Sequence, residues 1–544
     1  MFRIDAAARY DCRSTQEAGL SKRDASRDGC VALGRPDTVS RRATVAAVGV
    51  AAAAALVSIA IAWKTLDFFP HVSDELAYDF QARIFASGHL ALIPPEPARA
   101  FDLQQVIAKG GRWLSMYPPG WPLLLVPGVW LGVPWLVSPA ILFLSVLGVF
   151  TLAREMFDNA TAIAAAILFA TSPFVLLNGA GRMSHLPTLC LSLWCAVFLV
   201  RGARTASGPT LVLAGALGGA AWLVRQLSAT ALLVPFVAWC IARLHAKRAW
   251  AGGVARLASG AAPFAVLMLG FDWIVFGDPF RTGYAVKDPT LRFNGDNGTY
   301  LPYAELLARN LPRYFADLNR RLWGFPWPDL LPLVPLLRPA VGRGKDLLLG
   351  AGALALVLVY SCYWYYDIVY SGPRLAFEAV GFLAILAARG ILEAGGWLDG
   401  LAASLPRPAR IGVTALLAAA AAAAPLALRL PAELRYHASC YHGHTAEALR
   451  GVDAAGVGRE ALVLVSGPDF AYGSFFPGNA LDPTQGARVF VRDVAALRDD
   501  IVRRYSRREL WQVHVDLEPL RGPNRYADAF HVRGIVWHRV SPPR

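Results

Sequence analysis

Two adjacent carboxylates, Asp74 and Glu75, follow the first long apolar run of the chain. The sequence predicts a helix over residues 74–87, with Ser73 as its N-cap and Gly88 as its stop. The helix dipole favours ionised carboxylates in the first turn, and an ionised carboxylate can accept a proton from an attacking hydroxyl group. Acidic residues in a first turn also serve only to stabilise a helix, and this stretch taken alone favours that structural role.

Three arginines at the ends of apolar segments are the second chemical feature, at positions Arg182, Arg225 and Arg374. Arginine can stabilise the negative charge of a phosphate leaving group through charge-assisted hydrogen bonds. Arginines in such positions also reach out to lipid headgroups, so each of them has a structural interpretation as well. The sequence has no P-loop or dinucleotide-binding glycine pattern in the required strand and helix context, and it therefore does not indicate a nucleotide-linked donor.

The composition places these residues in a membrane protein. Of the 544 residues, 55% are hydrophobic and only 17% are charged, which is too apolar for a soluble protein of this length. The net charge is +14, but the basic residues form short clusters between apolar segments. That distribution is the positive-inside pattern of membrane proteins, and it does not indicate a nucleic-acid partner. The seven cysteines are scattered and predict no disulfide framework.

The apolar runs predict a helical polytopic membrane protein. The first run, residues 43–62, follows Arg41 and Arg42, which predicts an uncleaved anchor with a cytoplasmic N-terminus. Residues 1–42 are predicted to be a disordered cytoplasmic tail. Further runs bring the expected number of transmembrane helices to about eleven. They lie at about 137–153, 160–177, 186–200, 209–223, 227–242, 257–276, 326–337, 346–365, 375–388 and 411–428.

Alternation of these spans puts the short basic loops inside and three longer segments outside. The first outer segment, residues 63–136, contains "MYPPGWPLLLVPGVWLG", whose prolines and glycines predict an interfacial helix. The second, residues 277–325, is rich in aromatic side chains, arginine and asparagine. An interfacial belt is the default interpretation of this loop, and a border of a sugar site is the alternative.

The third outer segment, residues 430–544, is predicted to be a small extramembrane α/β domain. Its sequence "EALVLVSG" reads as a strand, "VRDVAALRDDIVRRYS" as a helix and "ELWQVHVDLEPL" as a second strand. No internal repeat indicates a transporter built from two related halves.

Four motifs in order carry a resemblance to a known family: "SDELAYDFQARIFASGHL", "YPPGWPLLLVPGVWLGVPW", "LAREMFD" and "GRMSH". Together they resemble the class C (GT-C) glycosyltransferases, particularly bacterial relatives of the protein O-mannosyltransferases and of the lipid A aminoarabinose transferase. The resemblance covers residues 43 to about 230, with a weaker match at "YSGPRLAFEAVGFLAILAARG". It implies a multispanning transferase domain, residues 43–429, that takes a sugar from a polyprenyl-phosphate donor on the outer side of the membrane.

The resemblance also assigns roles to single residues. Asp74 matches the catalytic base and Glu75 its neighbour, and Arg225 stands where many relatives carry a lysine. The chain departs from the pattern in "GRMSH", because relatives of the mannosyltransferase type often have Asp where His185 stands. The expected donor-phosphate ligands are the three arginines above, and the expected substrate contacts are Tyr78, Tyr117 and His185.

Metal binding is the weakest expectation. His71 and His185 could join Asp74 or Glu75 around an external divalent ion, but lone histidines near membranes more often make ordinary hydrogen bonds. The stretch "HASCYHGH" contributes metal-ligand residue types at a spacing that fits no common zinc module, namely His437, Cys440, His442 and His444. No metal site is assigned, and a divalent ion is left open.

The sequence thus predicts an inner-membrane glycosyltransferase. Its composition, rich in Ala, Arg and Gly, suggests a bacterium with a GC-rich genome, so the outer face would be the periplasm and the acceptor an envelope glycan, a lipid or a protein. One base suffices for direct displacement, which predicts inversion at the anomeric carbon. The alternatives are a polytopic transporter or lipid flippase, and a catalytically inactive relative that acts as a binding scaffold.

Overall fold

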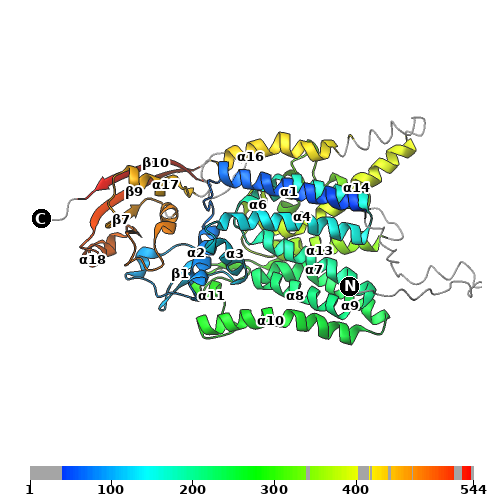
Figure 1. Ribbon diagram of the computed structural model, residues 1–544, viewed down its shortest axis with the longest axis horizontal. Coiled ribbons are helices and arrows are strands. Elements are labelled where there is room, and N and C mark those ends of the chain that lie inside the picture. The colour runs from blue at the N-terminus through cyan, green and yellow to red at the C-terminus, as the bar shows by residue number, and fades with distance from the viewer. Residues whose placement is uncertain are drawn as a thin grey trace, which may run out of the picture.

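The structure is a computed structural model that describes residues 40–337, 343–401, 416, 419–438, 443–468, 470–519 and 530–540. Long helices form a bundle at one end of the molecule, and a β-sheet lies at the other end (Figure 1). The short elements that follow the first long helix lie between the two. Residues 1–39 of the tail predicted over 1–42, and the positions of Cys440 and His442, lie outside the described residues.

Seven helices are long and apolar enough to cross a membrane, and a bent pair makes an eighth candidate among the described residues. The seven are α1 (Arg41–Lys64), α4 (Val137–Met156, extended back to Pro134), α7 (His185–Thr205), α9 (Gln226–Ala246), α10 (Trp250–Phe276), α13 (Gly344–Ser361) and α14 (Val380–Leu401, as the segment Arg374–Gly396). The pair is α5 (Asn159–Thr171) and α6 (Pro173–Ala180), which are bent by 63°. The break falls at Ser172, whose extended backbone is what a following proline favours.

The helical polytopic fold is confirmed, with seven or eight candidate spans among the described residues where about eleven were expected for the whole chain. The apolar run at 326–337 forms a short 3₁₀ helix, Leu331–Leu337, because Pro332 and Pro335 break an α-helix there. Helix α8 (Gly208–Val224) is apolar but shorter than the other spans. The run predicted at 411–428 lies largely outside the described residues.

Helices α8 and α10 pack closely through small residues. A side chain at Gly215 would clash with the backbone of Leu257, and one at Gly260 would clash with the backbone of Val212. Glycine at both positions lets the two backbones approach, which is how many membrane helices associate.

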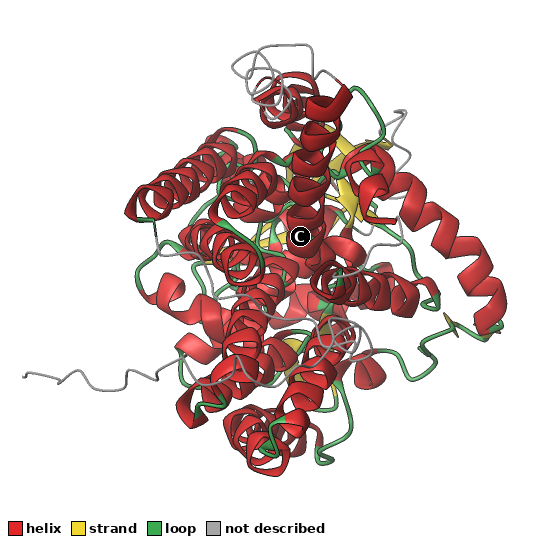
Figure 2. Cartoon of the chain, turned by 90° about the vertical axis from the view of Figure 1, so that its right-hand side faces the viewer, coloured by secondary structure: helices red, strands yellow, loops and turns green. Residues whose placement is uncertain are grey.

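The basic loops gather at one end of the bundle, which faces the viewer in Figure 2. Arg204 contacts Glu155 at 2.6 Å, and Lys247 donates to the carbonyl of Ala203 at 2.8 Å. These contacts join the C-terminal ends of α4, α7 and α9, as the predicted alternation of the spans requires.

At the opposite end of the bundle, helix α2 (Ser73–Ala86) confirms the helix predicted over 74–87. Ser73 is not its N-cap: Val72 occupies that position, and no side chain caps the helix. Gly88 has φ +83°, a conformation that glycine adopts readily, so its role in ending the helix is confirmed. The predicted interfacial helix is α3 (Gly120–Trp130). Between α2 and α3 lies the antiparallel pair β1 (Val106–Lys109) and β2 (Arg112–Ser115).

Several short elements border α2 and the bundle. They are α11 (Gly283–Lys287), β3 (Gly295–Asp296), β4 (Thr299–Tyr300), α12 (Tyr303–Arg321), β5 (Ile368–Val369) and β6 (Gly372–Pro373). Helix α12 lies within the loop predicted outside at 277–325 and has polar and apolar residues on different faces.

The C-terminal part contains a four-stranded mixed sheet in the order β10-β9-β7-β8. Strand β7 runs parallel to β8 and β9, with Val463 opposite both Phe490 and Trp511, and β9 pairs antiparallel with β10. The predicted strands correspond to β7 and β9, whereas β8 and β10 were not predicted, and residues 491 and 492 at the start of the predicted helix belong to β8. The bounds are α16 (Leu430–His437), α17 (Glu447–Ala454), β7 (Ala461–Ser466), β8 (Arg488–Arg492), α18 (Arg498–Arg504), β9 (Glu509–Pro519) and β10 (Phe530–Arg539).

The C-terminal domain packs directly on α2. Arg83 donates hydrogen bonds to the carbonyl oxygens of Pro477 at 3.2 Å and Asn479 at 2.7 Å. The ring of Phe476 lies 5.1 Å from that of Phe80, edge to face. The helix that carries Asp74 is therefore held from the side of the sheet.

Replacement of Arg83 by alanine leaves two carbonyl oxygens of the C-terminal domain without their donor. We expect Arg83→Ala to destabilise the protein by about 1–3 kcal/mol, measured as a lower apparent melting temperature in detergent. The matched control is Arg503→Ala, because the side chain of Arg503 is 77% exposed. Equal melting temperatures of the two variants would contradict the proposed clamp.

Candidate active site

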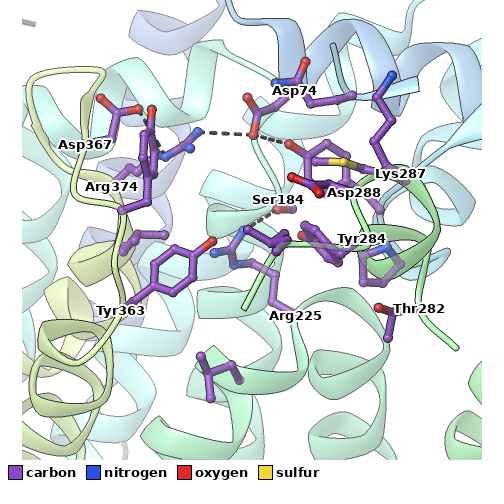
Figure 3. Close-up of a pocket in the computed structure, with 18 of the residues that line it drawn as sticks. Asp74, Ser184, Arg225, Thr282, Tyr284, Lys287, Asp288, Tyr363, Asp367 and Arg374 are labelled. Atoms are coloured by element: carbon purple, nitrogen blue, oxygen red, sulfur yellow. Dashed lines mark hydrogen bonds and ion pairs between the residues drawn. The ribbon is translucent and has the colours of Figure 1, made fainter. Parts of the chain in front are cut away.

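A pocket of about 840 Å³ opens where the bundle meets α2 and the loops around it (Figure 3). Its walls come from α2, the turn before α3, the junction of α8 and α9, the loop around α11, the end of α13 with the loop after it, and Phe470 of the C-terminal domain. The loop 277–325 therefore borders the pocket, which was the alternative interpretation of its sequence.

Asp74 lies in the wall of this pocket and points to two donors. Its Oδ1 accepts a hydrogen bond from the hydroxyl of Tyr117 at 2.6 Å and an ion-pair contact from Nη1 of Arg374 at 3.2 Å. Burial, followed by the nearby charge of Asp74, raises the pKa of Tyr117 well above its usual value. The phenol is therefore protonated and donates to the carboxylate.

Arg374 sits between two carboxylates, as Figure 3 shows. Besides Asp74, its Nε lies 3.4 Å from Oδ2 of Asp367. Its guanidinium group also lies 5.5 Å from the ring centre of Tyr365. These contacts fix the cation next to Asp74.

Arg225 is the second cation in the wall. Its Nε lies 3.1 Å from Oε1 of Glu378, and its Nη1 donates to the hydroxyl of Ser184 at 3.1 Å. The hydroxyl of Ser184 lies 2.9 Å from that of Tyr78. The groups that line the pocket thus include the carboxylate of Asp74 and the guanidinium groups of Arg225 and Arg374, a combination suited to general-base chemistry beside an anionic leaving group.

Aromatic rings line the remaining wall next to Asp74. The ring of Tyr117 lies 4.6 Å from that of Tyr78 and 5.6 Å from that of Tyr284. Tyr78 and Tyr117 were predicted as substrate contacts and both line the pocket, whereas Tyr284 was not singled out in the sequence. Tyrosine rings in tilted and edge-to-face contact present apolar faces and hydroxyl groups, which suits a sugar.

Glu75, predicted beside Asp74 in the catalytic site, does not line the pocket. It is 1% exposed and accepts three hydrogen bonds. The donors are the backbone N–H of Arg182 at 2.6 Å, the hydroxyl of Tyr370 at 2.8 Å and the backbone N–H of His71 at 3.0 Å. Neighbouring helical positions point about 100° apart, so only one carboxylate of the pair faces the pocket.

Arg182 and His185 also lie behind the pocket wall. The guanidinium group of Arg182 pairs with Asp79 and donates to the carbonyl of Phe68. Nδ1 of His185 lies 3.1 Å from Oε1 of Glu378. The predicted set is therefore split: Asp74, Arg225, Arg374, Tyr78 and Tyr117 line the pocket, whereas Glu75, Arg182 and His185 do not.

The pocket residues missed in the sequence lie far from "SDEL" along the chain. Asp367 and Tyr365 belong to "YWYYD", and Glu378, which lies behind the wall and contacts Arg225, belongs to "RLAFEAV". The dense aromatic residues before Asp367 were a usable signal, and the weaker family match at residues 370–390 contained Glu378.

The described residues contain no group of three or more His, Cys, Asp and Glu side chains placed to hold a metal ion. His71 is buried, which lowers its pKa to about 4, and its Nε2 lies 3.2 Å from the carbonyl of Leu66. His71 and His185, which were weighed as partners of the acidic pair around a divalent ion but not assigned to a metal site, form no such group with it among the described residues.

Burial raises the pKa of Glu75 from its usual 4.5 to about 7, although three donors oppose the shift. The folded chain therefore binds this proton more tightly than the unfolded chain does. The resulting contribution to stability is complete below about pH 4.5 and is lost as the pH rises through about 7.

We expect the wild type to lose stability relative to Glu75→Gln between pH 4.5 and pH 7.5, by on the order of 1–3 kcal/mol. The measurement is the apparent melting temperature of both proteins across this range, because groups common to both cancel in the difference. A difference that stays constant with pH would show that Glu75 does not titrate there.

Comparison with known proteins gives two informative matches. Residues 133–269 match the family model described as dolichyl-phosphate-mannose-protein mannosyltransferase. Over 90% of this chain and 97% of the other, the fold is similar to that of ArnT from Cupriavidus metallidurans bound to undecaprenyl phosphate, with a TM-score of 0.52 and 15% identity. The apo state of the same protein matches over the same shares, with a TM-score of 0.50 and 15% identity.

A third solved structure, the apo oligosaccharyltransferase of Archaeoglobus fulgidus, has 13% identity over 86% of this chain and 69% of the other, with a TM-score of 0.43. No curated protein sequence matches the chain. The family match falls on the helices from α4 to α10. Part of the chain therefore matches a glycosyltransferase family model, and the fold of the chain is similar to that of ArnT.

Proposed function

We propose that the chain transfers a sugar from a polyprenyl-phosphate-linked donor to a hydroxyl group of an envelope glycan, a lipid or a protein. The single observation that carries this proposal is the position of Asp74 in a pocket that also holds Arg225 and Arg374. A base and two cations facing one space are what a displacement with a phosphate leaving group requires.

In the proposed reaction Asp74 accepts the proton of the acceptor hydroxyl, and the hydroxyl oxygen forms a bond to the anomeric carbon. The bond between that carbon and the phosphate oxygen breaks, and its electron pair stays on the phosphate. Arg225 and Arg374 stabilise the charge that develops there. Tyr117 keeps the carboxylate of Asp74 oriented through its 2.6 Å hydrogen bond.

Two observations support the donor class. The similar ArnT structure is bound to undecaprenyl phosphate, and the pocket of the present chain has arginines rather than a nucleotide-binding loop. Glu75, Arg182 and His185 are proposed to support the wall from behind, because their contacts join α2 to the start of α7 and to the segment Arg374–Ala379.

The proposed location is the bacterial inner membrane, with the N-terminus in the cytoplasm and the pocket and C-terminal domain in the periplasm. Support comes from the basic residues near Glu155 and Ala203, which gather at the end of the bundle opposite to the pocket. Basic loops stay on the cytoplasmic side of a membrane.

Replacement of Asp74 by asparagine keeps the shape of the side chain and removes the base. We expect Asp74→Asn to lower the transfer rate by about 10²–10⁴-fold. The measurement is the mass profile of envelope glycans, lipids and proteins in cells that lack the protein and are complemented with wild type or variant at matched levels. The control is Asp346→Asn, since Asp346 pairs with Arg389 at the basic end of the bundle. Full restoration of the profile by Asp74→Asn would contradict the proposed base.

Asp74 is the proposed base, and one base suffices for direct displacement, so we expect inversion at the anomeric carbon. The measurement is NMR of the product made from a donor of known anomeric configuration by purified protein. Net retention would instead require a covalent intermediate and would exclude the mechanism proposed for Asp74.

A further inference from the structure

Glu378 is a buried carboxylate that touches a pocket cation without lining the pocket. Its exposed fraction is 0%, and its Oε1 is shared by Nε of Arg225 and Nδ1 of His185, each at 3.1 Å. Its Oε2 has no hydrogen-bond partner among the described residues. All the contacts of this carboxylate therefore serve one arginine and one histidine.

The contact with Arg225 is an ion pair at Nε, which also donates a hydrogen bond to the hydroxyl of Ser228 at 3.3 Å, and both terminal nitrogens contact residues of the pocket wall. Nη1 donates to Ser184, which in turn contacts Tyr78, and Nη2 lies 3.4 Å from the hydroxyl of Tyr360. The two terminal nitrogens of a guanidinium group form the edge that binds a phosphate in a bidentate manner. An anchor on Nε thus presents this edge to the pocket.

His185 fixes the carboxylate in turn. A carboxylate that already accepts from Arg225 can only accept from the imidazole, so Nδ1 of His185 carries a hydrogen. The ring of His185 is itself held 6.4 Å from that of Phe377, edge to face. The anchor of Arg225 is therefore rigid on the side away from the pocket.

The chain segment Arg374–Ala379 connects the two cations of the pocket. Arg374 at its start contacts Asp74, and Glu378 four residues later contacts Arg225. One short segment therefore sets the position of both guanidinium groups relative to the proposed base.

We propose that Glu378, held by His185, is a positioning residue that orients Arg225 so that its terminal nitrogens bind the donor phosphate. This inference rests on the proposed function, because it assumes that a lipid-linked phosphate enters the pocket. It assigns to Glu378 a geometric role, which is to hold Nε of Arg225.

A geometric role and an electrostatic role have opposite signatures. The side chain of Gln is nearly the same shape as that of Glu and keeps an oxygen for both donors, but it carries no charge. Asp keeps the charge and withdraws the carboxylate by one methylene group. If Glu378 acts as an anchor, Glu378→Gln retains the function and Glu378→Asp loses it. If it acts by neutralising Arg225, Glu378→Gln strengthens phosphate binding and Glu378→Asp changes little.

The experiment measures binding of undecaprenyl phosphate and of undecaprenol to the full chain in detergent, and uses the ratio of the two affinities. We expect the wild type to favour the phosphate by at least about tenfold. Glu378→Asp and Glu378→Ala should lower this ratio about tenfold, and Glu378→Gln should stay within about threefold of the wild type. In an Arg225→Gln background, Glu378→Ala should change the ratio less than about twofold, because the residue acts through Arg225.

The matched control is Glu433→Gln, because Glu433 is 2% exposed and paired with Arg429 but does not line the pocket.

An affinity ratio that is unchanged in both Glu378→Asp and Glu378→Ala would show that Glu378 only fills space, and it would overturn the inference. A higher ratio in Glu378→Gln would overturn it in favour of charge neutralisation. If the wild type binds undecaprenyl phosphate and undecaprenol equally well, the proposed polyprenyl-phosphate donor is contradicted. The proposed role of Glu378 is then contradicted as well, because it depends on that donor. Melting temperatures show whether each variant is folded. If Glu378→Ala does not fold, the ratios of Glu378→Gln and Glu378→Asp alone distinguish the geometric role from the electrostatic one.

Discussion

Pairing of buried charges is the constraint on which the junction between the bundle and α2 depends. An ionised group that is removed from water without a partner destabilises a protein by several kcal/mol. Asp74 is paired with Arg374, and Glu378 with Arg225. Glu75 receives three neutral donors instead, and burial raises its pKa although these donors oppose the shift. Asp74 and Glu378, which pair with arginines, thus contact the cations of the pocket, whereas Glu75, which has only neutral donors, lies in the interior.

The motif "GRMSH" is where these pairs are connected. The backbone N–H of Arg182 binds Glu75, the hydroxyl of Ser184 contacts Tyr78 and Arg225, and His185 contacts Glu378. Five consecutive residues therefore touch α2, the start of α9 and the segment after β6. Such a connection explains why residues that are not in the pocket wall influence its geometry.

The C-terminal domain completes the support of α2 from the opposite side. Phe476 and the carbonyl of Asn479 contact residues on the last two turns of the helix, and Phe470 reaches the pocket wall. An isolated helix of 14 residues is only marginally stable in water. Contacts from the bundle and from the sheet together keep Asp74 in place.

Residue types and their periodicity in the sequence were sufficient to determine the membrane-spanning class, the helix that carries Asp74, and the strands β7 and β9. Hydrophobicity over a fixed length and the distribution of basic residues are local properties, so they can be read without the fold. Tertiary structure alone decided which of Asp74 and Glu75 faces the pocket, that Arg182 lies behind the wall, and that Glu378 holds Arg225. These outcomes depend on contacts between residues 100 to 300 positions apart in the chain, and on the direction in which each side chain leaves its helix, which spacing along one segment does not specify.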